Sequence, residues 1–190
     1  YFSSKGATVF ALDIDRNSLL KLKETENSIY IFVCNVADNE DVEKTVEDIF
    51  KINTSVNVLI NNAGIMKNAP LINILNRPDG RHSIKLWDQV VKVNQSSFFY
   101  MARSVVNNMI KYRSKGVIIN ISSIAARGNI GQTAYSATKA AVEAMSKVWA
   151  KELGVFGIRS LCVAPGFINS KGAKDALEEF LVQTLEHQRL

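Results

Sequence analysis

The sequence predicts an α/β fold in which a parallel sheet lies between two layers of helices, in a three-layer, doubly wound arrangement. Short apolar runs rich in β-branched residues alternate along the chain with longer segments whose apolar residues recur at helical spacing. Small and polar residues follow the ends of the predicted strands, where open parallel sheets bind their ligands. The 190 residues are enough for a substantial core, and we expect a single domain over 1–190.

Composition argues against several classes of protein. Hydrophobic content of 47% and charged content of 22% are typical of soluble globular domains. The net charge is +5, but basic and acidic residues are interleaved, so we expect no nucleic-acid surface. No apolar run approaches the ~20 residues that a membrane span needs. Cys34 and Cys162 lie in apolar runs and are predicted to be buried reduced thiols of a cytoplasmic protein. His82 and His187 have no ligand-like neighbours, so no metal site is expected.

The first third of the chain predicts strands and helices in alternation. Apolar runs over 7–12 and 29–33 predict strands, and the segment 17–23 predicts a short helix. A second helix is predicted through Lys51, with Asp38 or Asn39 as its N-cap.

Asp13 directly follows the first of these strands. In a dinucleotide-binding fold, an acid at this place bonds the adenosine ribose hydroxyls and repels a 2′-phosphate. Asp13 therefore predicts NAD as cofactor, with NADP less favoured. The alternative is that Asp13 only caps the next helix, and Arg16 would partly offset the repulsion.

The middle of the chain predicts a strand, an irregular segment and a long helix. The strand over 56–60 ends in Asn61-Asn62-Ala63-Gly64, where small residues allow a ligand to approach the backbone. Residues 65–83 hold two prolines and an Asp-Gly turn, and predict a loop or short hairpin. The helical stretch over 84–112 carries Asn94, which needs a hydrogen-bond partner if it is buried. That partner is either a water linked to Lys139 or a group of the core.

The segment from Gly116 to Lys139 carries the chemistry. A strand (Val117–Ile121) is followed by Ser122 and Ser123, a glycine-containing loop, and a helix that reaches about Leu153. Tyr135 and Lys139 are four residues apart and share one helix face. An ammonium beside a phenol favours the phenolate, so the tyrosine could exchange a proton near neutral pH. Ser123 could hold the oxygen that is protonated.

The rest of the chain completes the pattern. The helix that carries Tyr135 is apolar on two sides, so one face can cover the sheet and the other suggests a subunit partner. A strand over 158–163 leads into Pro165-Gly166-Phe167-Ile168, and 172–187 predicts a polar-rich helix.

Taken in order, these motifs resemble the short-chain dehydrogenase/reductase family over essentially the whole chain. The matching segments are N-N-A-G at 61–64, Asn94, N-I-S-S at 120–123, Y-S-A-T-K at 135–139 and P-G-F-I at 165–168. The resemblance implies a Rossmann fold and a nicotinamide-dependent oxidoreductase that interconverts a carbonyl and a secondary alcohol. Within the family the chain looks most like 3-oxoacyl-(acyl-carrier-protein) reductases, which implies a small carbonyl or acyl-thioester substrate and a homodimer or homotetramer.

The resemblance also implies roles for single residues. Asn94 would hold a proton-relay water, Ser123 would position the carbonyl and Tyr135 would be the acid–base. Lys139 would hold the nicotinamide ribose and tune the tyrosine. Cofactor contacts are expected from Asp13, Asn35, Val36, Asn62, Ala63, Gly64, Tyr135, Lys139, Pro165, Gly166 and Ile168.

The chain also departs from the family pattern. The spacing from Ser123 to Tyr135 is one residue shorter than the commonest one, so Ser122 stays an alternative. The family's first strand with its Gly-rich phosphate loop, and its last helix and strand, have no counterpart here. We therefore expect part of an NAD(H)-dependent oxidoreductase. The alternative is an inactive fragment or an oligomerising relic that cannot hold the cofactor pyrophosphate.

Overall fold

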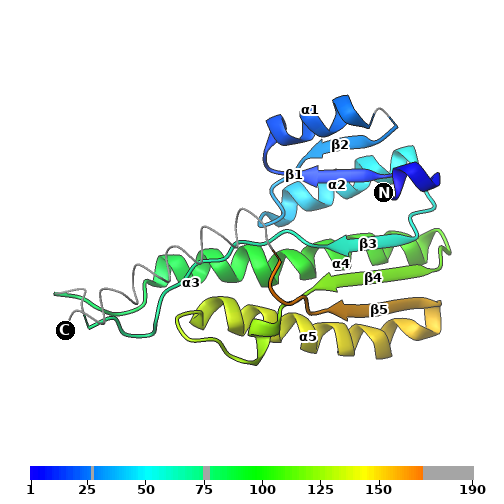
Figure 1. The fold of residues 1–190 in the computed structure, drawn as a ribbon. Coiled ribbons are helices and arrows are strands. Elements are labelled where there is room, and N and C mark those ends of the chain that lie inside the picture. The colour runs from blue at the N-terminus through cyan, green and yellow to red at the C-terminus, as the bar shows by residue number, and fades with distance from the viewer. Residues whose placement is uncertain (27, 75–77, 169–190) are drawn as a thin grey trace.

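The computed structural model describes residues 1–26, 28–74 and 78–168 and has the predicted alternation of strands and helices (Figure 1). The strands are β1 (Phe10–Asp13), β2 (Tyr30–Val33), β3 (Val58–Asn61), β4 (Gly116–Ile121) and β5 (Ile158–Val163). The helices are α1 (Arg16–Thr25), α2 (Asn39–Ile52), α3 (Ile84–Val91), α4 (Ser97–Lys111) and α5 (Thr133–Leu153). A π-helical turn, Lys92–Ser96, joins α3 to α4. The α/β class expected from the sequence is confirmed.

Within the described residues the strands form two hydrogen-bonded groups, β1–β2 and β3–β4–β5. Pairing is parallel in both groups, and all five arrows point the same way in Figure 1. The carboxyl ends of all five strands therefore lie toward one edge of the molecule. The parallel pairing was predicted from the sequence.

Several predicted boundaries shift by a few residues. The first strand begins at Phe10, and α1 extends beyond the predicted 17–23 at both ends. The Asp15 carboxylate caps α1 by accepting hydrogen bonds from two N–H groups of its first turn. Asp38 caps α2 as expected. In the described part of the segment 65–83, called the hairpin segment below, an antiparallel bridge joins Ile72 to Arg81, and residues 75–77 lie outside the described residues. The helix predicted over 172–187 lies outside the described residues.

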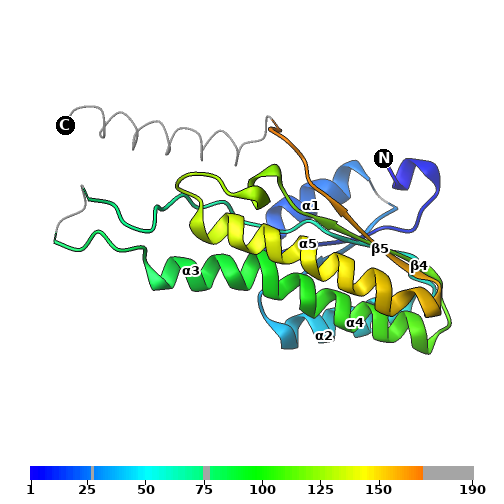
Figure 2. The same ribbon diagram turned by 90° about the horizontal axis from the view of Figure 1, so that it is seen from below.

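The helices cover the two faces of the sheet unequally. Figure 2 shows α1 on one side of the strands and α2 and α4 on the other. The main core lies on the second side, where apolar residues of β3, β4 and β5 meet α2 and α4. Its buried members include Val42, Val46, Leu59, Met101, Val105, Met109, Ile118 and Ile158. On the opposite face Val58, Ile60, Leu161 and Val163 are 43–49% exposed.

The two cysteines differ in burial. Cys34 belongs to the core, and burial raises the pKa of its thiol. Cys162 on β5 is only partly buried, which corrects the expectation that both would be buried. Both side chains are free thiols.

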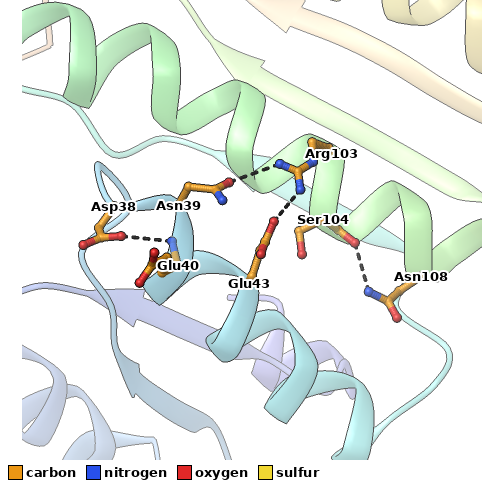
Figure 3. Close-up of polar contacts among 7 residues, drawn as sticks. All are labelled: Asp38, Asn39, Glu40, Glu43, Arg103, Ser104 and Asn108. Atoms are coloured by element: carbon orange, nitrogen blue, oxygen red, sulfur yellow. Dashed lines mark hydrogen bonds and ion pairs between the residues drawn. The ribbon is translucent and has the colours of Figure 1, made fainter.

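Polar contacts join α2 to α4 at the surface (Figure 3). Arg103 forms an ion pair with Glu43, and its Nη1 lies 3.4 Å from Oδ1 of Asn39. The groove between the two helices is lined by Glu43, Glu47, Arg103, Ser104, Asn107 and Asn108. Exposed ion pairs of this kind add little stability, and the lining includes none of the residues predicted to act in catalysis.

Candidate active site

The predicted site residues gather at the carboxyl ends of the strands. Asp13, Asn61 and Ile121 are the last residues of β1, β3 and β4. Asn35 follows β2 by two residues, and Pro165 follows β5 by two. In open parallel sheets this edge is where ligands bind. The fold therefore places the candidate residues where a cofactor of the predicted kind would lie.

Lys139 is the buried centre of the site. Its side chain is on α5, one helical turn after Tyr135, and the residue is only 3% exposed. The ammonium Nζ donates to the carbonyl of Ile121 at 2.8 Å. It lies 5.7 Å from the ring centroid of Tyr135 and 5.3 Å from that of Phe98. Burial lowers the pKa of Lys139 to about 8, while the nearby Cys162 acts in the opposite direction.

Helix α5 is tied to the sheet by a buried chain of polar side chains. Nδ2 of Asn61 donates to Oδ1 of Asn120 at 2.9 Å. Nδ2 of Asn120 in turn donates to Oγ of Ser146 at 2.9 Å. The serine hydroxyl completes the chain by donating to the carbonyl of Val142 at 2.7 Å. These bonds fix the helix that carries Tyr135 and Lys139 relative to β3 and β4.

Asn94 lies in the π-helical turn and is fully buried. Its Oδ1 accepts from the N–H of Ile65 and its Nδ2 donates to the Ile65 carbonyl, both at 2.8 Å. Of the two partners considered for Asn94, a water or a group of the protein core, the structure shows the second, which is the main chain of Ile65. An amide oxygen has a second lone pair and its nitrogen a second hydrogen, so the side chain can still bind a water.

Gly64 lies where the loop after β3 approaches the side chains of Asn94 and Lys139. A Cβ built at Gly64 would lie 3.4 Å from Oδ1 of Asn94 and 3.7 Å from Nζ of Lys139. The loop after β3, the π-helical turn and α5 therefore meet at one point. A side chain at residue 64 would fill this space, which agrees with the predicted need for a small residue there.

The structure separates the two serines that the sequence left as alternatives. Ser122 is 3% exposed, and its Oγ lies 3.1 Å from the Lys139 carbonyl and 3.2 Å from Oε1 of Glu143. Ser123 is partly exposed, and its Oγ accepts from the N–H of Ala125 at 3.1 Å. That bond leaves the hydroxyl hydrogen of Ser123 for a further acceptor.

The predicted cofactor residues lie along the same edge. The Asp13 carboxylate accepts from the N–H of Asp15 at 2.9 Å, and Oδ1 of Asn35 accepts from the N–H of Ala37 at 3.1 Å. The Pro165 carbonyl accepts from the N–H of Ile124 at 3.1 Å. The other predicted contacts are exposed or half-exposed: Val36, Asn62, Ala63, Gly64, Gly166 and Ile168.

These residues fit a nicotinamide dinucleotide in their chemistry. A carboxylate suits ribose hydroxyls, small residues admit a ligand close to the backbone, and an ammonium carries three N–H donors, of which Ile121 takes one. Asp13 and Asn35 belong to the two-stranded group, whereas Lys139 packs beside the three-stranded group. A ligand that touches all of them would span both groups.

Sequence reasoning missed a polar junction beside Tyr135. Nε2 of Gln132 donates to Oδ1 of Asn68 at 3.0 Å, and the N–H of Ala69 donates to the Gly131 carbonyl at 2.7 Å. The junction joins the hairpin segment to the loop before α5. No local pattern could have revealed it, because the two partners are 64 residues apart.

Across residues 1–26, 28–74 and 78–168, no group of three His, Cys, Asp or Glu side chains is arranged to hold a metal ion. In the same part of the chain, no helix combines the length and apolar character required to cross a membrane.

Comparison with known proteins identifies the family. The family model described as short chain dehydrogenase matches residues 1–180. The chain belongs to this family. In this chain of the short-chain dehydrogenase family, a buried lysine lies one helical turn after a tyrosine, at the strand ends of a parallel sheet.

Curated relatives cover most of the chain. A 3-oxoacyl-(acyl-carrier-protein) reductase of Thermotoga maritima is 41% identical over 174 residues, which are 89% of this chain and 67% of the relative. A sorbitol-6-phosphate 2-dehydrogenase of Klebsiella pneumoniae is 33% identical over 178 residues, 90% of this chain and 63% of the relative. A 3-oxoacyl-(acyl-carrier-protein) reductase of Chlamydia trachomatis is 37% identical over 153 residues, which are 80% of this chain and 58% of the relative. This chain thus spans about three fifths of the length of these relatives.

Proposed function

We propose that this chain carries the catalytic residues of an NAD(H)-dependent oxidoreductase that interconverts a carbonyl and a secondary alcohol by hydride transfer. The observation that carries the proposal is the burial of the Lys139 ammonium beside the ring of Tyr135, at the strand-end edge. By likeness to the reductases it matches, the substrate class is a small carbonyl or a 3-oxoacyl thioester.

Each residue of the site has a part in this proposal. A bound nicotinamide would supply or take up the hydride. Tyr135 gives its phenolic proton to the carbonyl oxygen in reduction and takes it back in oxidation. Ser123 donates its hydroxyl hydrogen to the same oxygen. Lys139 holds the ribose hydroxyls with the N–H donors that Ile121 does not use, and Asn94 binds the water that replenishes the proton.

The choice of Ser123 over Ser122 is supported by their different surroundings. The hydroxyl of Ser122 is buried against the main chain of α5 and the carboxylate of Glu143. Ser123 lies one residue further along, at the partly exposed edge.

Asp13 supports NAD over NADP as the cofactor. Its exposed carboxylate at the end of β1 is suited to ribose hydroxyls and would repel a 2′-phosphate. The remaining contacts with the cofactor are proposed for the other residues predicted to bind it along the strand ends.

We also propose a cytoplasmic homodimer or homotetramer. Helix α5 supports this, because a row of its small and apolar side chains remains exposed. The row consists of Ala137, Ala140, Ala144 and Val148. A second copy of the chain packed against this row would bury it.

Replacing Tyr135 with Phe tests the proposed function in the full-length protein. Removing the hydroxyl takes away the proton donor and leaves the ring beside Lys139, so turnover should fall by about two to four orders of magnitude. NADH affinity, measured by fluorescence titration, should stay similar. Tyr112→Phe, on an exposed ring at the end of α4, is the matched control and should keep full turnover. Retained turnover in Tyr135→Phe would refute the proposal.

The alternative is an inactive fragment or an oligomerising relic. The enzyme and the relic can be distinguished by isolating the protein from its source and measuring its intact mass and its binding of NADH. An intact mass near 21.1 kDa together with no NADH binding would support the relic, whereas a larger protein that binds NADH would support the enzyme.

A further inference from the structure

We propose that Phe98 is a positioning residue, whose ring holds the ammonium group of Lys139 in place beside Tyr135. The inference rests on the proposed function, because the part assigned to Phe98 belongs to the same site. It is not a catalytic residue, since it acts only through Lys139.

The geometry is that of a buried cation over an aromatic ring. The Lys139 Nζ lies 5.3 Å from the Phe98 ring centroid, inside the ~6 Å range in which the ring quadrupole attracts a cation. Phe98 is 1% exposed, so core packing prevents the ring from moving away. Water cannot solvate the ammonium well at this depth, and the attraction of the ring is correspondingly greater.

The Phe98 ring lies beside the Lys139 ammonium, where a buried ion pair would have a carboxylate. In the described part of the chain the ion pairs are Lys51–Asp48, Arg81–Asp79 and Arg103–Glu43, none of which involves Lys139. A carboxylate would keep the amine charged at all ordinary pH values. The weaker attraction of a ring holds the ammonium in position while burial still lowers the pKa of Lys139 to about 8.

The titratable neighbours of Lys139 are few in the described residues. Tyr135 lies one turn before it on α5, and Cys162 faces it from β5. Glu143 is one turn after it and meets Ser122, which contacts the Lys139 carbonyl. Asn94, in the turn before Phe98, is an uncharged amide, and replacing the ring with another apolar side chain changes no charge near the amine.

The test is Phe98→Leu in the full-length protein, with lysines labelled by 13C at Cε and observed by NMR. The Lys139 signal is assigned by its loss in Lys139→Arg. Loss of the ring removes a stabilisation of the charged form, so the Lys139 titration midpoint should fall by about half a unit to one unit. Turnover should fall about tenfold or more because the ammonium is less well placed.

Two variants act as controls. Phe98→Tyr keeps the ring and should keep the midpoint of the parent protein. Phe99→Leu changes the next residue, which is 46% exposed, and should leave both midpoint and turnover unchanged. If Phe98→Leu does not fold, Phe98→Met, which fills similar space without a ring, takes its place with the same expected result.

An unchanged midpoint in the ring-less variant, or an equal shift in Phe99→Leu, would overturn the inference. A raised midpoint would also contradict it, because that is the result expected if water simply entered the space. The outcome is separable from that of the proposed function. If Tyr135→Phe keeps its turnover but Phe98→Leu lowers the titration midpoint of Lys139, the proposed function fails and the role of the Phe98 ring stands.

Discussion

Two adjacent serines at the end of β4 have different surroundings because successive side chains of an extended chain point to opposite sides. Ser122 points toward α5 and is bonded there, whereas Ser123 faces the strand-end edge. The tertiary contacts of Ser122 therefore support Ser123 as the hydroxyl proposed to meet the substrate.

Alanine substitution of each serine should separate chemistry from stability. Ser123→Ala should lower turnover by about one to two orders of magnitude, because its hydroxyl is proposed to serve the substrate. It should lower the free energy of unfolding by only about 0.5–1 kcal/mol, because the bond lost, from the N–H of Ala125, lies at a partly exposed position. Ser122→Ala should lower the free energy of unfolding by about 1–2 kcal/mol, because a buried hydrogen bond is lost. Steady-state kinetics and urea unfolding check both. If Ser122→Ala loses turnover while keeping its stability, the two roles are exchanged.

At the scale of elements, the site depends on how α5 is held against the sheet. The buried chain from Asn61 through Asn120 to Ser146 connects β3, β4 and α5 side by side. Such a network specifies one arrangement of its elements, since each member is costly to leave without its partner. The helix position that it fixes is also the position of Tyr135 and Lys139.

Asn120→Ala should therefore be among the most damaging changes outside the site itself. It leaves the buried amide of Asn61 and the hydroxyl of Ser146 each short of a partner, so the free energy of unfolding should fall by about 2–4 kcal/mol. Asn57→Ala, which removes an exposed bond to the Lys115 carbonyl, is the control and should cost less than about 1 kcal/mol. Urea denaturation measures both, and equal costs would contradict the role given to the buried chain.

The chain is least regular over 65–83, 124–134 and 169–187, and we expect these segments to form the walls of the substrate pocket. The bonds from Gln132 to Asn68 and from Ala69 to Gly131 join the first two of these walls directly beside Tyr135. The third expected wall, over 169–187, lies outside the described residues. The polar junction gives two irregular segments a defined position relative to α5.

At the scale of the whole molecule, the proposed cofactor would connect the two strand groups. Asp13 ends a strand of the β1–β2 group, and the buried ammonium lies against the β3–β4–β5 group. The end of the cofactor that carries the adenosine ribose would meet the first group, and the nicotinamide would meet the second. Cofactor preference can therefore be changed without disturbing the residues of the chemistry.

Asp13→Asn tests this separation. The amide keeps an acceptor for the N–H of Asp15 but removes the charge, so the preference for NADH over NADPH in kcat/KM should fall about tenfold or more. Asp15→Asn removes a neighbouring charge and keeps an N-cap for α1, so it should leave the preference unchanged. An equal effect of both variants would show that the general charge of the region, rather than Asp13, sets the preference.

The sequence by itself determined the elements and the edge at which the site lies. Hydrophobic period, the Asp38 cap and the small residues after each strand are local signals, and a parallel sheet brings all its strand ends together. Only the tertiary structure decided which side chains face one another. The burial of Ser122, the ring of Phe98 beside Lys139 and the Gln132–Asn68 bond all depend on residues far apart in the chain. Contacts of that kind are selected by the packing of whole elements, which no short stretch of sequence encodes.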